Sequence, residues 1–223
     1  EVVELARQAS ASNLDVLYFA DSMGSMDSEQ TRKIVGWFRE GWHGPLGIHT
    51  HDNLGRALEN TLAAMADGVT WLDSTVTGMG RGPGNARTEE LAIEMAERRS
   101  KPVNLIALMK LVNQRFKPLQ DRYGWGTNPY YYLAGKYGIH PSYIQEMLSD
   151  SRYGEEDVIA VLEHLRVEGG KKFSLNTLDA ARHFYRGAPR GAWAPESLIS
   201  GREVLILGSG PGVTGHQRAL EAY

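Results

Sequence analysis

Between residues 14 and 98, the apolar positions alternate between short unbroken runs and sets with helical spacing. Leu14–Ala20 is a nearly continuous apolar run, typical of a strand that is buried on both faces of a parallel sheet. The pattern predicts two further strands near residues 45–49 and 70–76, with helices that include about 56–67 and 86–98. The strands start near residues 15, 46 and 70, which is the spacing of βα units, so we predict parallel α/β structure.

After Lys101-Pro102 the pattern becomes helical. We predict helices at about 103–116, 129–137, 141–149, 155–165 and 177–185, and assign residues 101–196 to a helical domain. Residues 187–201 are rich in Pro and Gly and are interpreted as a linker, and a predicted strand at 202–208 follows it. The three predicted domains are therefore residues 1–100, 101–196 and 197–223, the last being the start of a Rossmann-like α/β domain.

Composition and charge exclude several classes of protein. The 223 residues hold 24 Lys+Arg against 27 Asp+Glu, so the chain lacks the basic surface that nucleic acid or an anionic membrane requires. No apolar run approaches the roughly 20 residues of a membrane span. The absence of Cys excludes disulfides, thiolate metal sites and a Cys nucleophile, and it suits the cytoplasm.

The pair His49-Thr-His51 stands at the end of the second predicted strand. Residues two apart on a strand point to the same side, and the carboxyl end of parallel strands carries the active site in α/β folds. Two neighbouring imidazoles are good ligands for a divalent cation, whereas the alternative is two surface histidines near a loop. Asp52 and Asn53 are more simply explained as caps of the next helix.

Two other segments follow predicted strands. The loop Gly78–Asn85 contains four glycines, and such a loop before a helix can hold an anion on backbone N–H groups; alternatively, Asn85 caps the helix. The loop lacks the spacing of a dinucleotide-binding motif. Asp21 and Ser22 end the first strand, where both a site-facing role and a turn role suit them.

Taken together, these segments resemble the HMG-CoA lyase-like metal-dependent family, which includes pyruvate carboxyltransferase domains and, nearest in pattern, 4-hydroxy-2-oxovalerate aldolases. The resemblance covers about residues 1–117 and is carried by Asp21-Ser-Met-Gly, by Leu46 to Ala57 with its His-x-His element, and by Asp73 to Asn85. It implies a TIM (β/α)8 barrel of which this chain supplies about strands five to seven.

The resemblance also implies a site and a reaction. His49, His51 and Asn85 become metal ligands for Mn²⁺ or Mg²⁺, and Asp21, Ser22 and Thr75 lie behind them or face the substrate. The implied reaction is cleavage of a C–C bond next to a 2-oxo acid, with a small-molecule substrate and a homo-oligomeric enzyme as further expectations. A condensing synthase that joins acyl-CoA and a 2-oxo acid is an alternative within the same family.

The tail contains a third candidate motif. Gly210, Gly212 and Gly215 give a GxGxxG pattern after a predicted strand, which favours a nucleotide at the last domain and supports a rival interpretation as an oxidoreductase. The chain opens inside a helical pattern and stops within another, so we interpret it as an internal segment of a longer protein. The first-strand Asp of the family and the general base are missing from the segment, which is therefore expected to be inactive alone.

Overall fold

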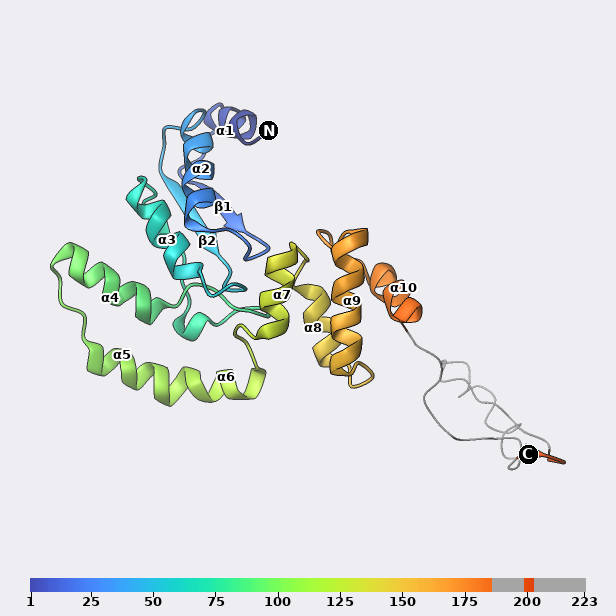
Figure 1. Cartoon of the computed structure of the whole chain (residues 1–223). Helices are drawn as coiled ribbons and strands as arrows, with labels where there is room; N and C mark the ends of the chain where they lie inside the picture. The colour runs from blue at the N-terminus through green and yellow to red at the C-terminus, as the bar shows by residue number, and fades with distance from the viewer. Residues whose placement is uncertain (186–198, 203–223) are drawn as a thin grey trace, which may run out of the picture. The chain divides into compact units, whose positions relative to one another are not determined.

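A computed structural model describes residues 1–185 and 199–202 of the chain. The chain divides into two units, residues 1–186 and 187–223. Figure 1 shows the helices and strands of the described residues. Residues 203–208 of the strand predicted at 202–208, and the glycines Gly210, Gly212 and Gly215, lie outside the described residues, so the nucleotide-binding interpretation stays a prediction. Within the described part of the chain, no helix has the length and apolar character needed to cross a membrane.

A three-stranded parallel sheet organises the first part of the chain. Its strands β1 (Leu17–Asp21), β2 (Leu46–Thr50) and β3 (Trp71–Leu72) lie in the order β1-β2-β3. In the register, Leu17 faces Leu46, and Ile48 faces both Phe19 and Leu72. This arrangement confirms the parallel α/β prediction and places the carboxyl ends of the strands at one edge.

Three helices connect or precede these strands: α1 (Val2–Ser10), α2 (Ser28–Arg39) and α3 (Ala57–Ala66). Asp27 caps α2 by accepting a hydrogen bond from the Gln30 N–H at 2.8 Å. The inner faces of the helices and sheet share one apolar core, formed by Ala6, Phe19, Met26, Val35, Trp42, Leu46, Ile48, Ala64 and Val69. Burial of these side chains is the main force that holds the helices on the sheet.

The third strand is shorter than its sequence predicts. We expected residues 70–76, but only Trp71 and Leu72 pair with β2. Beyond Asp73 the backbone bonds to a different segment: the Thr75 N–H donates to the Ala86 carbonyl at 3.0 Å, and the Thr88 N–H donates to the Thr75 carbonyl at 2.9 Å. The apolar pattern marked an extended segment correctly but gave no information about its partner.

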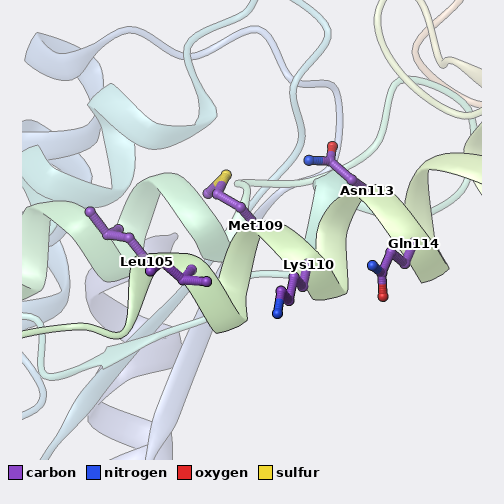
Figure 2. Close-up of a pocket in the computed structure, with 6 residues that line it drawn as sticks. Leu105, Met109, Lys110, Asn113 and Gln114 are labelled. Atoms are coloured by element: carbon purple, nitrogen blue, oxygen red, sulfur yellow. The ribbon is translucent and has the colours of Figure 1, made fainter.

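A long helical stretch follows α4 (Thr88–Arg99): α5 (Leu105–Leu111), a π-helical turn (Val112–Phe116) and α6 (Lys117–Tyr123). Helical structure thus extends past the predicted end at residue 116, because Pro118 stands in the first turn of α6, where a missing N–H is tolerated. Leu105, Ile106 and Met109 of α5 are exposed around a shallow hollow of about 410 Å³ (Figure 2).

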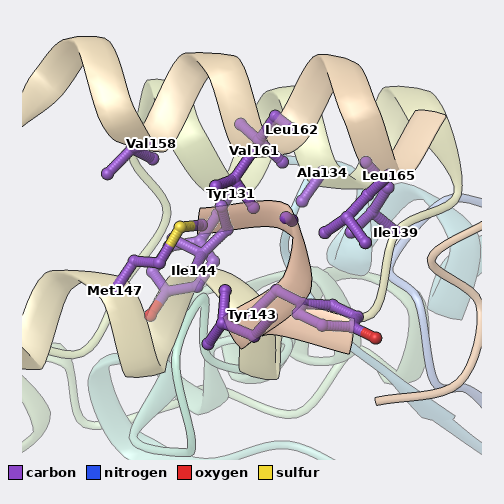
Figure 3. Packing of buried hydrophobic residues seen from close by; sticks show 12 residues of the cluster. Tyr131, Ala134, Ile139, Tyr143, Ile144, Met147, Val158, Val161, Leu162 and Leu165 are labelled. Atoms are coloured by element: carbon purple, nitrogen blue, oxygen red, sulfur yellow. The ribbon is translucent and has the colours of Figure 1, made fainter. Parts of the chain in front are cut away.

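Four helices form a second core: α7 (Pro129–Tyr137), α8 (Ser142–Ser149), α9 (Glu155–Glu168) and α10 (Leu175–Tyr185). Asn128 caps α7 by accepting from the Tyr131 N–H at 3.0 Å, and Gly138 ends it with a left-handed φ of +65°. Figure 3 shows the shared core, in which Tyr131, Tyr143 and Ile144 pack with apolar residues of α9 such as Leu162 and Leu165.

The segment that leads into α7 is bonded to loops at the carboxyl edge of the sheet. The Thr127 hydroxyl donates to the Asn53 carbonyl at 2.8 Å, the Gly126 N–H donates to the Gly82 carbonyl at 2.9 Å, and the Trp125 indole donates to the Thr77 carbonyl at 3.1 Å. Residues 1–186 therefore form one compact unit with two apolar cores. The three-domain division that we drew from the sequence stays a prediction.

Candidate metal centre

Strand β2 brings two imidazoles to the carboxyl edge of the sheet. His49 lies near the end of the strand and His51 directly after it. Their ring centroids are 4.9 Å apart, and the ring planes meet at 83°. Both residues are half-buried, so each ring keeps a face toward solvent. The two-residue repeat of the strand thus produces the neighbouring pair that the sequence predicts.

Each imidazole is held through its Nδ1 atom. His51 Nδ1 lies 2.8 Å from the backbone carbonyl oxygen of Asp21, and His49 Nδ1 lies 3.2 Å from Oδ2 of Asp73. Both partners only accept hydrogen bonds, so the neutral rings carry their proton on Nδ1. The Nε2 lone pairs then remain free to bind a cation. A carboxylate or carbonyl behind the ring is the usual support of a metal-binding histidine.

Asp73 is a site residue that the sequence motifs did not indicate. This residue is the first polar position after β3, and its carboxylate faces the histidine of the neighbouring strand. The position of Asp73 directly after a strand could have indicated this role, because side chains that follow adjacent parallel strands meet at the carboxyl edge of the sheet. The Tyr18 hydroxyl also bonds to Asp73; burial first, and then this charge and hydrogen bond, raise the pKa of Tyr18.

Asn85 lies beside the imidazole pair, on the segment 84–88 that is hydrogen-bonded to Thr75 and to residues 50–52. Its backbone forms an antiparallel bridge with His51, and the Ala86 N–H donates to the Thr50 carbonyl at 3.3 Å. The Asn85 amide nitrogen donates to the Met79 carbonyl at 3.2 Å and to the Thr75 hydroxyl at 3.5 Å. These contacts fix the nitrogen end of the carboxamide and leave Oδ1 as the atom available to a ligand.

The capping alternative for Asn85 does not hold. Helix α4 begins at Thr88, its N-cap is Arg87, and no side chain caps it. The N-cap position of α3 is Arg56, so neither Asp52 nor Asn53 is the predicted cap, although Asp52 Oδ1 accepts from the Ala57 N–H at the start of α3 at 3.0 Å. Burial raises the pKa of Asp52, and the Ala57 N–H and the Arg87 charge oppose that shift.

The structure places Asp21, Ser22 and Thr75 in three different environments. The Asp21 carboxylate is buried and accepts from the Ser25 and Met26 N–H groups, at 3.1 Å each, so it shapes the loop after β1. Burial raises its pKa despite those hydrogen bonds and the nearby His51. Ser22 is exposed, and Thr75 contacts Asn85. Asp21 supports His51 with its backbone rather than its side chain.

The helical region brings further polar residues toward this edge. Asn53 is fully buried, and its Nδ2 donates to the Tyr131 carbonyl at 3.5 Å. His140 lies within electrostatic reach of Arg81 and His51: burial lowers its pKa, and both of those charges lower it further. Sequence patterns gave no sign of these contacts, because the residues are far apart along the chain.

The donor set fits part of a divalent-cation site. It offers two imidazole nitrogens and one amide oxygen, which suit Mn²⁺ and similar ions. Among residues 1–185 and 199–202, however, no three His, Cys, Asp or Glu side chains converge at metal-binding distances. The set therefore supplies neutral ligands and contains no carboxylate ligand. A carboxylate from elsewhere in the protein would have to complete it.

Known proteins are similar mainly to the first half of the chain. A family model described as HMGL-like matches residues 1–114. The 4-hydroxy-2-oxovalerate aldolase of Pelotomaculum thermopropionicum is 41% identical over 91 residues, which are 41% of this chain and 27% of that protein. The enzyme of the same name from Carboxydothermus hydrogenoformans is 29% identical over 175 residues, or 77% of this chain and 52% of its own length. A homocitrate synthase of Frankia alni is 36% identical over 104 residues, covering 47% and 30% of the two chains.

Solved structures show the same fold. The N-terminal domain of a Bacteroides vulgatus protein described as an aldolase has a TM-score of 0.57 and 33% identity, covering 61% of this chain and 46% of that one. The carboxyl transferase domain of Rhizobium etli pyruvate carboxylase with 3-hydroxypyruvate has a TM-score of 0.60 at 16% identity and covers 95% of this chain and 37% of its own. The fold is α/β, and the chain spans about half or less of the length of these relatives.

Proposed function

Because the chain belongs to the HMGL-like family, we propose that the protein carrying it is a divalent-metal-dependent aldolase that cleaves a C–C bond next to a 2-oxo acid. The observation that carries the proposal is the imidazole pair with both Nδ1 atoms held by acceptors. Our proposed ligands from this chain are His49, His51 and Asn85. Mn²⁺ or Mg²⁺ is the cation that we expect.

The substrate class follows from the similarity to 4-hydroxy-2-oxovalerate aldolases. Cleavage of 4-hydroxy-2-oxovalerate breaks the bond between C3 and C4. A base takes the proton of the C4 hydroxyl, acetaldehyde leaves, and the electron pair remains on C3 as the enolate of pyruvate, which a proton then quenches. A bound divalent cation supplies Lewis-acid stabilisation of that negative charge, worth several kcal/mol.

The residues of this chain have positioning roles in the proposal. The Asp73 carboxylate and the Asp21 carbonyl hold the two rings in one tautomer and one orientation. Thr75 and the Met79 carbonyl hold the amide of Asn85. The segment 84–88 and strand β2 are joined by backbone hydrogen bonds, which keep the three side chains together before a ligand arrives. Such preorganisation is what a cation site requires.

A condensing synthase is the second candidate, because homocitrate synthases also match the chain. Both reactions form or use an enolate beside a carbonyl, so the same ligand set suits either. We also propose a small-molecule partner, a homo-oligomeric state and a cytoplasmic location for the intact protein. The oxidoreductase alternative depends on residues 210–215, which lie outside the described residues.

The test is an activity assay on the intact protein with 4-hydroxy-2-oxovalerate and Mn²⁺, in which lactate dehydrogenase reports pyruvate. We expect His49→Ala and His51→Ala each to lower kcat/KM by at least 100-fold. His43→Ala removes an exposed imidazole that precedes β2 and serves as the matched control. Full turnover by the His49→Ala variant, or by the wild-type enzyme in excess chelator, would contradict the proposal.

A further inference from the structure

We propose that Arg81 and Tyr131 form a binding site for a small organic oxyanion, a carboxylate or phosphate on an apolar body. The site is a cleft of about 390 Å³ between the glycine loop and the helical region. Tyr123, Trp125 and Leu148 contribute its apolar wall. Clefts of this size commonly bind small molecules through an apolar wall and a few placed polar groups.

Arg81 carries the charge of the cleft. It is the only charged residue among the described residues that line it, and within that part of the chain no carboxylate lies at ion-pair distance from it. Its Nε donates to Oε1 of Gln145 at 2.8 Å, and one terminal nitrogen donates to the hydroxyl of Ser142, a fully buried residue. Both partners are neutral oxygens, so they fix the guanidinium without compensating its charge.

The immobilised guanidinium of Arg81 can still donate hydrogen bonds to an oxyanion. It has five N–H donors in one plane, and the two contacts above use only part of them. A planar oxyanion such as a carboxylate can accept two parallel bonds from it. Because Gln145 and Ser142 already immobilise the side chain, little conformational entropy is lost when the anion binds.

Tyr131 supplies a second donor. The residue is only 5% exposed and lines the cleft, and its hydroxyl has no hydrogen-bond partner among the described residues. Burial raises its pKa, partly opposed by the Arg81 charge, so the hydroxyl stays protonated at neutral pH. Gly82 passes directly over it with a φ of +58°, and a Cβ there would lie 3.2 Å from the hydroxyl oxygen. A side chain at residue 82 would therefore crowd the Tyr131 hydroxyl.

This site goes beyond the proposed aldolase function. Its residues are not those that we assign to the cation, and its ligand needs no metal. The two sites share the loop Gly78–Asn85, which carries Arg81 toward the helices and Asn85 toward the imidazoles. In this proposal the Arg81 side chain gives the loop an anion-binding role, and the separate expectation that its backbone N–H groups hold an anion stays a prediction.

The experiment is calorimetric titration of the metal-free intact protein with sodium benzoate, its neutral analogue benzamide, and inorganic phosphate at constant ionic strength. We expect saturable binding of benzoate and at least tenfold weaker binding of benzamide. Arg81→Gln is expected to weaken benzoate at least tenfold. Arg115→Gln, which removes the same charge from an exposed position outside the cleft, is expected to leave it unchanged.

A second variant guards against loss of folding in Arg81→Gln. Leu148 is 47% exposed at the cleft, so Leu148→Glu is expected to fold, to place a competing carboxylate beside Arg81 and to weaken benzoate at least tenfold. If phosphate displaces benzoate, the negative charge of the ligand is sufficient for recognition. If phosphate does not displace it, the apolar body of the ligand is also required. Both results support the site. Benzoate binding that is unchanged in Leu148→Glu and in folded Arg81→Gln would show that benzoate does not bind at Arg81, and it would overturn the proposal.

Discussion

Replacing Asp73 with Asn tests whether the imidazole pair is built for a cation. The substitution keeps the shape of the side chain but removes the charge that faces His49 Nδ1 at 3.2 Å. Loss of such a supporting carboxylate typically lowers metal affinity by about 10- to 100-fold. Asp73 is 46% exposed and His49 is 32% exposed, so water screens the pair and we expect the lower end, about tenfold.

The assay is calorimetric titration of Mn²⁺ into the intact protein. A tenfold loss corresponds to about 1.4 kcal/mol of binding free energy. Asp67→Asn is the matched control, because Asp67 pairs with Arg32 at 2.7 Å, away from the imidazoles, and is also partly exposed. Thermal unfolding of both variants is expected to stay close to wild type, since neither carboxylate is buried.

The supporting role of Asp73 is refuted if Asp73→Asn binds Mn²⁺ as tightly as wild type while His49→Ala does not bind it. That result would mean that the orientation of His49 does not depend on the carboxylate. Tyr18 gives an independent check on the contact itself. Because the charge of Asp73 contributes to the raised pKa of Tyr18, the pKa of this phenol should fall in Asp73→Asn, as measured by NMR titration.

Three further predictions concern stability and are measured by urea unfolding. Burial and the Arg81 and His51 charges lower the pKa of His140 in the folded state. The neutral imidazole therefore contributes to the free energy of unfolding above the unfolded pKa of about 6.5, and this contribution is lost as pH falls. His140→Gln should thus lose less stability than wild type between pH 7 and 5. Equal losses would contradict this. Asn128→Ala removes the cap of α7 and should lower the free energy of unfolding by about 1 kcal/mol, whereas no change would mean that water replaces the cap. Leu162→Ala empties part of the helical core and should lower it by about 2–5 kcal/mol, and a loss below 1 kcal/mol would show that the core closes over the gap.

Local sequence signals determined much of the secondary structure. Asn128-Pro129 and Gly138 mark the ends of α7, and Asp27 marks the start of α2, because caps and left-handed glycines act within one turn of the chain. The apolar run Leu14–Ala20 also predicted a strand, but its predicted burial on both faces is wrong, because Phe19 of β1 is buried while the neighbouring Tyr18 is 40% exposed. The pairing of His49 with His51 also followed from the sequence, since the two-residue repeat of a strand is a local property.

The tertiary structure alone decided which distant groups meet. Asp73 reaches His49 only because β2 and β3 are neighbours, and the backbone of Thr75 bonds to Ala86 and Thr88 instead of continuing β3 along β2. Arg81 finds Ser142, 61 residues later, because α8 packs near the glycine loop. The sequence by itself determined the individual helices, strands and imidazoles, whose geometry depends on near neighbours. The partners of those groups required the folded chain, because packing sets contacts between residues that no short-range pattern connects.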